Sequence, residues 1–125
     1  METEDVDIFE KTHAQMEGLY EELSALSKKA PNDAVNKFKI KFINILLEQS
    51  GKLLGDTYKP FHDFVIFNID ELPTNSDATL IIGQFLNCME KFRSDNITIS
   101  SGVYVWVIDG NPSKIRTYSP KKLKG

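Results

Sequence analysis

Mostly apolar residues recur alternately three and four positions apart over the first 30 residues of the chain. Because such positions fall on one face of a helix, the spacing predicts an amphipathic helix of about seven turns. Pro31 disfavours helical backbone at Ala30, so this helix should end there. The row consists of Phe9, Thr12, Met16, Leu19, Leu23 and Leu26.

A second periodic segment follows at once. Either Asn32 or Asp33 can cap its helix, which should run to Leu54 and stop at Gly55. Its apolar stripe is wide enough to pack against two neighbours, which predicts a helix at the centre of a bundle. Residues 1–55 are therefore expected to form a helical hairpin. The stripe comprises Val35, Phe38, Phe42, Ile45 and Leu46, widened by Ile43, Leu47, Leu53 and Leu54.

The next part of the chain is less regular. Residues 56–75 contain too many aromatic and aliphatic side chains for a disordered linker, while Pro60 and Pro73 prevent a long helix. We expect an ordered connection that lays its rings on the bundle. Residues 76–96 should then form a third helix, with Thr74 in a position to cap it.

After residue 96 the apolar period changes to two, which is typical of β-strands. A turn signal at residues 109–113 precedes a run at 114–118 that can return as a further strand, so residues 97–118 should form an antiparallel hairpin or meander. Residues 119–125 form a basic tail. The expected fold is a single α+β, predominantly helical domain: three long helices form a bundle, followed by a small C-terminal antiparallel β-hairpin or meander.

Composition narrows the possible classes of protein. The chain has 125 residues and a net charge of −3, which argues against a surface devoted entirely to nucleic acid. Its single cysteine, Cys88, cannot form an internal disulfide, which favours a reducing compartment. The acidic N-terminus lacks the features of a signal peptide, and the longest apolar run, 45–47, is too short to cross a bilayer. We therefore expect a cytoplasmic protein without a membrane partner.

No motif in the chain specifies a reaction. Cys88, His62 and Asp63 are the only conceivable nucleophile, base and carboxylate, and Cys88 lies in an apolar row of the third helix, where a thiol packs as a small hydrophobe. His13 and His62 have no neighbouring ligand cluster, and no glycine-rich phosphate loop occurs. The sequence thus favours a protein that is not an enzyme and has no metal site or cofactor.

Two features suggest a protein partner. The first helix carries an acidic face, and the C-terminal hairpin carries a mixed aromatic and basic cluster of the kind found in interface hot spots, unless its rings cover the core instead. We expect a small non-catalytic protein-binding module, acting as a regulator, inhibitor, immunity-type protein or accessory subunit, and the amphipathic first helix also permits a homodimer. In a general way the chain resembles small helical accessory or inhibitory proteins of bacteria. The predicted contact residues are Glu10, Glu17 and Glu21 on the helix and Tyr104, Trp106, Arg116 and Tyr118 on the hairpin.

The alternative function is nucleic-acid binding. Lysines cluster at the start of the second helix and again in the C-terminal strand and tail, where they can contact phosphates beside aromatic rings. The residues of this alternative are Lys37, Lys39 and Lys41, together with Lys114, Lys121 and Lys122.

Overall fold

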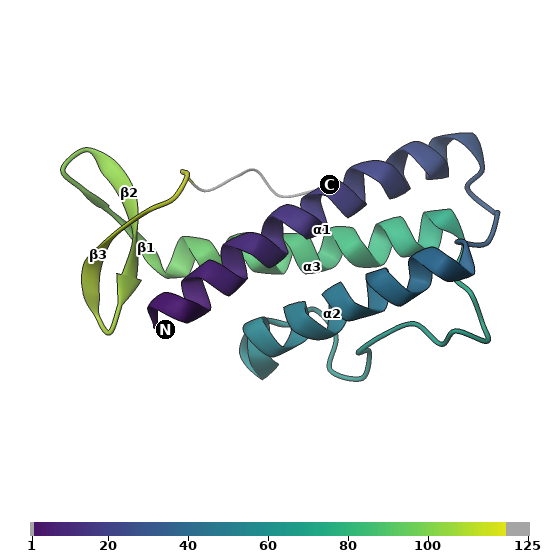
Figure 1. Cartoon of the computed structure of the whole chain (residues 1–125), viewed down its shortest axis with the longest axis horizontal. Helices are drawn as coiled ribbons and strands as arrows, with labels where there is room; N and C mark the ends of the chain where they lie inside the picture. The colour runs from purple at the N-terminus through teal and green to yellow at the C-terminus, as the bar shows by residue number, and fades with distance from the viewer. Residues whose placement is uncertain (1, 120–125) are drawn as a thin grey trace.

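The computed structural model describes residues 2–119 and confirms the expected fold class, with three helices followed by a three-stranded antiparallel sheet (Figure 1). The predicted meander is therefore present. The elements are α1 (Thr3–Lys29), α2 (Lys37–Tyr58), α3 (Asn75–Asp95), β1 (Ile97–Ser100), β2 (Val103–Ile108) and β3 (Asn111–Arg116).

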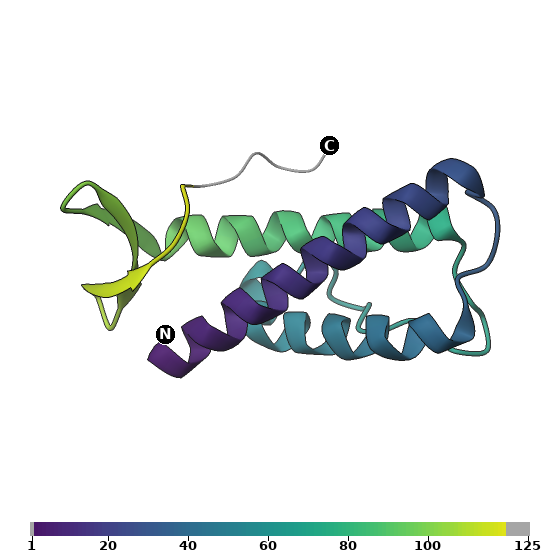
Figure 2. The same cartoon turned by 45° about the horizontal axis from the view of Figure 1, so that its top comes forward.

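The helices run along the long axis of the molecule, and the sheet stands at the end where α3 finishes (Figures 1 and 2). α1 runs antiparallel to both α2 and α3 and makes its most extensive contact with α3. α3 contacts both other helices and leads directly into β1. α2 also contacts both other helices, so it packs against two neighbours as its apolar pattern predicts, although its contacts are less extensive than those between α1 and α3.

α2 begins four residues later than the sequence predicts. Asn36 caps it, because the Asn36 Oδ1 accepts hydrogen bonds from the backbone N–H groups of Phe38 (2.8 Å) and Lys39 (3.2 Å). The preceding residues are instead tied to the start of α3, since the Val35 N–H donates to the Pro73 carbonyl oxygen at 2.8 Å. This cross-link uses backbone groups that a longer helix would have consumed.

The interpretation of the wide apolar stripe on α2 as a packing surface is wrong for three of its nine members. Phe38, Phe42 and Ile45 are 66%, 52% and 59% exposed, because no other described element covers their face of the helix. The opposite face packs on the bundle through the buried residues Ile40, Ile43, Leu47, Ser50 and Leu54, with Leu46 and Leu53 partly buried against the core.

The connection between α2 and α3 is ordered, as predicted. The backbone leaves helical geometry at Gly55, where φ is +66°, so the predicted break at this residue is present although one further turn follows. The Asn44 side chain then holds the connection by two hydrogen bonds of 2.9 Å to the backbone of Phe67. The Phe64 ring packs against those of Phe67 and Phe85, which places the aromatic residues of the connection on the core.

The third helix begins at the predicted cap, since the Thr74 Oγ1 accepts the Asp77 N–H at 3.0 Å. At the far end of the fold, β2 and β3 are joined by Asp109 and Gly110, whose φ values of +53° and +78° match the right-handed twist of a two-residue hairpin. β3 therefore starts at Asn111, three residues before the predicted run, and as an edge strand it tolerates Pro112.

Candidate functional site

The exposed apolar face of α2 is the most unusual surface of the described residues. Phe38, Phe42 and Ile45 occupy positions i, i+4 and i+7, so they form one row along the helix, which we call the α2 stripe. The Phe38 and Phe42 rings meet edge to face, with their centroids 5.2 Å apart. The stripe therefore presents a continuous apolar surface where a monomeric protein would ordinarily show polar side chains.

A row of three hollows crosses α2 beside this stripe. The first, of about 270 Å³, lies between α1 and α2. It shares Ile45 and Gln49 with the second, of about 340 Å³, and the second shares Glu48 and Lys52 with the third, of about 330 Å³. The shared residues make the hollows neighbours, so the surface around the stripe is grooved and can receive protruding side chains. The first hollow is lined by Lys11, Gln15, Phe42, Ile45, Leu46 and Gln49.

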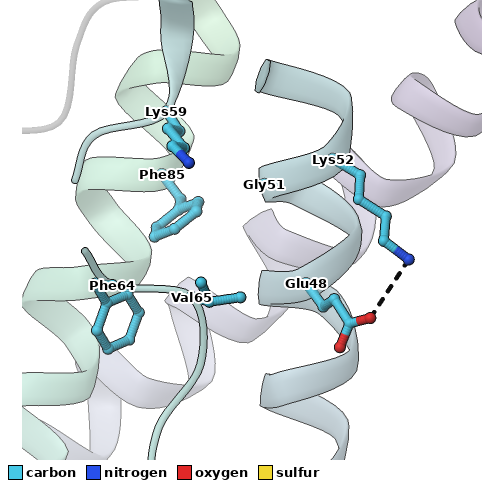
Figure 3. Close-up of a pocket in the computed structure, with 7 residues that line it drawn as sticks. All are labelled: Glu48, Gly51, Lys52, Lys59, Phe64, Val65 and Phe85. Atoms are coloured by element: carbon cyan, nitrogen blue, oxygen red, sulfur yellow. Dashed lines mark ion pairs between the residues drawn. The ribbon is translucent and has the colours of Figure 1, made fainter. Parts of the chain in front are cut away.

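The third hollow separates α2 from the connection that follows it (Figure 3). Phe64 and Phe85 form its inner wall, and Val65 projects toward α2. The Glu48–Lys52 ion pair, with 3.4 Å between the Glu48 Oε1 and Lys52 Nζ, lies on the outer side of α2. The hollow thus has an apolar interior and a charged rim.

The charges that flank the α2 stripe are mainly positive. Lys37 and Lys41 are exposed on α2, and exposed Lys11 of α1 lines the first hollow on the other side of the stripe. Lys39 differs, because its Nζ lies 2.8 Å from the Glu22 Oε1. The stripe therefore lies between lysines on two helices, in a chain whose net charge is negative.

Two of the three predicted contact residues on the acidic face of α1 have partners within the molecule. Glu10 is half-buried and accepts a 3.5 Å hydrogen bond from the Thr117 hydroxyl. Glu17 is half-buried with its Oε1 3.2 Å from the His13 Nδ1, and His13 itself is buried. Of the three predicted contact residues on this helix, only Glu21 is exposed.

The partner of Glu17, His13, belongs to a buried network of charged and polar side chains. The His13 Nε2 lies 2.8 Å from the Glu90 Oε1, and the other Glu90 oxygen accepts a hydrogen bond from the Arg93 guanidinium. Arg93 also donates to the Tyr118 carbonyl oxygen at 3.0 Å, and its guanidinium lies over the Tyr118 ring. The network joins α1, α3 and the end of β3, so its role is to hold the sheet onto the helices. His13 is therefore a buried member of this network.

The predicted aromatic surface of the hairpin is not a contiguous exposed patch. Trp106 is fully buried, with its ring against Phe9 of α1, which excludes it as a contact residue for a partner. Tyr104 is half-buried, whereas Arg116 and Tyr118 are exposed on β3 and just beyond it. The alternation of the strand places the largest ring on the helices, where burial stabilises it most.

The lysines of the nucleic-acid alternative do not gather on one surface. Lys37, Lys39 and Lys41 lie in the first turns of α2, and exposed Lys114 lies on β3 at the opposite end of the molecule (Figure 1). Lys121 and Lys122 fall outside the described residues.

The residues considered for catalysis lie in different environments. Cys88 is packed against the hydrophobic core, and desolvation raises the pKa of its thiol, whereas His62 and Asp63 are exposed in the connection. Within residues 2–119 no group of three or more histidine, cysteine, aspartate or glutamate side chains could hold a metal ion. No helix of the described part of the chain has an apolar stretch long enough to span a membrane.

The signal that could have identified the α2 stripe was its width. Apolar positions on α2 occupy more of the helix circumference than two flanking elements can cover, and Phe38 and Phe42 alternate with lysines.

No family model, curated protein or solved structure matches this chain.

Proposed function

We propose that this chain is a non-catalytic protein-binding module whose contact surface is the α2 stripe with the hollows beside it. The observation that carries the proposal is the half-to-two-thirds exposure of Phe38, Phe42 and Ile45 in one row of a well-formed helix. A contiguous apolar row of this kind is typical of surfaces that another protein covers.

The energetics favour such a partner. Fully burying a Phe or Ile side chain stabilises a complex by about 1.5–3 kcal/mol relative to leaving it in water. Three such residues, each about half covered by a partner, would contribute several kcal/mol before the entropic cost of association is subtracted. The proposal replaces the acidic face of α1 and the hairpin as principal contacts, because Glu10, Glu17 and Trp106 are engaged within the fold.

Site-specific photocrosslinking in the native cell tests this surface. A photoreactive phenylalanine analogue replaces Phe42, and in a matched control it replaces Leu80, which is 61% exposed on α3. We expect a discrete protein adduct from position 42 and none from position 80. An adduct only from position 80, or from neither position, would refute the proposed surface.

A second variant supports the reading of that result. Phe42→Glu should abolish the complex detected by co-purification, while the free energy of unfolding falls by no more than about 1.5 kcal/mol because the side chain is half exposed, so the protein stays folded. Leu80→Glu serves as the control and should leave the complex intact.

We also propose a cytoplasmic location. Its support is the lone Cys88, which has no second cysteine with which to form an internal disulfide. Cell fractionation with an antibody against the chain tests this placement.

A further inference from the structure

We propose that the occupant of the α2 stripe is an acidic, amphipathic helix of another protein, and this inference rests on the proposed function. Such a helix would lay an apolar row on Phe38, Phe42 and Ile45 and carry carboxylates along its flanks. Shape, area and charge each support this occupant.

The shape of the surface fits a single helix. Phe38 and Ile45 are seven residues apart along α2, which corresponds to two turns or about 10 Å. Residues at this spacing match the i, i+4, i+7 anchors of helix-in-groove recognition, in which side chains of one helix enter hollows on the other. The hollows between α1 and α2 and beside Ile45 provide such positions.

The area of the stripe also suits a helix better than a globular face. The three side chains, at 66%, 52% and 59% exposure, offer about 300 Å² of apolar surface. A stable interface between two globular proteins buries about 800 Å² on each partner, so the stripe alone is too small for it. One face of a short helix needs no larger apolar contact.

Charge decides what flanks the apolar row of the partner. Lys11 borders the stripe on the α1 side, and Lys37 and Lys41 border it on the other side. These three lysines form no ion pair with any residue of the described part of the chain, whereas Glu48 and Glu22 are paired with Lys52 and Lys39. Carboxylates on both flanks of a docked helix would pair with them, as the charged flanks of coiled coils do.

The same charges disfavour a second copy of this chain. If α2 packed on α2 of another molecule, the two positively charged surfaces would face each other. On each surface Glu48 is paired with Lys52 and Glu22 with Lys39, which leaves the positive charges of Lys11, Lys37 and Lys41. Like charges juxtaposed in this way oppose association.

Two synthetic helical peptides provide the probes. Each has about 20 residues with leucine at the heptad a and d positions, and they differ only in having glutamate or lysine at e and g. Fluorescence anisotropy with the full chain at about 50 mM salt should show the glutamate peptide binding at least about tenfold more tightly, and about 0.5 M salt should reduce that preference.

Matched variants identify the surface. Lys11→Glu combined with Lys41→Glu should reverse the preference between the two peptides, whereas Lys114→Glu combined with Arg116→Glu makes the same change of charge on β3 and should leave it unaltered. Phe42→Glu should abolish binding of both peptides.

Several outcomes would overturn the inference. Equal binding of the two peptides, or tighter binding of the lysine peptide, would refute it. So would the absence of binding at about 1 mM peptide, where a complex is worth only about 4 kcal/mol. A preference that the lysine variants do not change would also refute it. Sedimentation of the wild type as a dimer that Phe42→Glu dissociates would assign the stripe to a second copy. A crosslinked partner at position 42 without a charge preference would leave the proposed function standing and refute only this inference.

Discussion

Trp106 of β2 packs edge-on against Phe9 of α1, with the ring centroids 5.2 Å apart and the ring planes at 72°. Phe9 in turn stacks on Phe92 of α3, also at 5.2 Å. The first helix, the last helix and the sheet therefore meet in one aromatic cluster, which joins the two ends of the described chain.

Truncating Trp106 should be among the most damaging changes to the fold. Because Trp106 is fully buried, Trp106→Ala should lower the free energy of unfolding by about 3–5 kcal/mol. Ile99→Ala on β1 is the control, since Ile99 is 62% exposed and its truncation should change stability by less than about 1 kcal/mol. Urea denaturation followed by circular dichroism measures both, and equal losses in the two variants would contradict the central role of the cluster.

Breaking the buried ion pair should cost more than removing it altogether. Arg93→Met leaves the Glu90 carboxylate buried without its guanidinium partner, which should cost about 3–5 kcal/mol of stability. In the double variant Arg93→Met/Glu90→Leu no such charge is left, so the loss should be clearly smaller than the sum of the two single losses. A double-mutant cycle by chemical denaturation checks this, and strict additivity would argue against coupling.

The hydrogen bonds from Lys91 (2.9 Å) and Tyr58 (2.8 Å) to the Asp95 carboxylate hold the pKa of Asp95 below its ordinary value. A carboxyl whose pKa is lowered in the folded state stabilises the fold at pH above its ordinary pKa, and this contribution is lost as the pH falls through the lowered folded value. The stability of wild type should therefore fall more steeply below about pH 4 than that of Asp95→Asn.

An NMR titration of the Asp95 side chain tests the cause directly. In Tyr58→Phe one hydrogen bond to the carboxylate is absent, so the pKa of Asp95 should move back toward its ordinary value while the Lys91 contact remains. An unchanged titration curve in this variant would show that Tyr58 does not contribute.

Two glycines should respond in opposite directions to the same substitution. Gly18 lies exposed within α1, and a methyl group there would meet no neighbouring atom, so Gly18→Ala should stabilise the protein by about 0.5–1 kcal/mol. Gly55 has a φ of +66°, a conformation that side-chain-bearing residues rarely adopt, so Gly55→Ala should destabilise it by about 1 kcal/mol. Thermal unfolding of the pair checks both, and a stabilising Gly55→Ala would mean that the helix continues straight through this residue.

The elements whose limits depend on local chemistry were predictable. Pro31 ends α1, Thr74 caps α3, and Asp109 with Gly110 turns the chain between β2 and β3. The start of α2 was not, because the decisive contact is the hydrogen bond between Val35 and Pro73, which are 38 positions apart.

The candidate site was harder to predict than the fold. Glu10 and Glu17 look like free surface charges in sequence, yet Thr117 and His13 engage them. Phe42 looks like a core residue, yet it is half exposed. Periodicity assigns residues to faces of a helix, but it cannot tell which face a distant element will cover.

By itself the sequence determined which segments are helix and which are strand, since these depend on the spacing of apolar side chains and on caps and turns within a few residues. Only the tertiary structure decided that the most extensive helix contact is between α1 and α3, that Trp106 is buried and that one apolar row of α2 remains uncovered. The physical reason is that burial depends on contacts between residues far apart in the chain, and a helix with two apolar rows can turn only one of them to its neighbours.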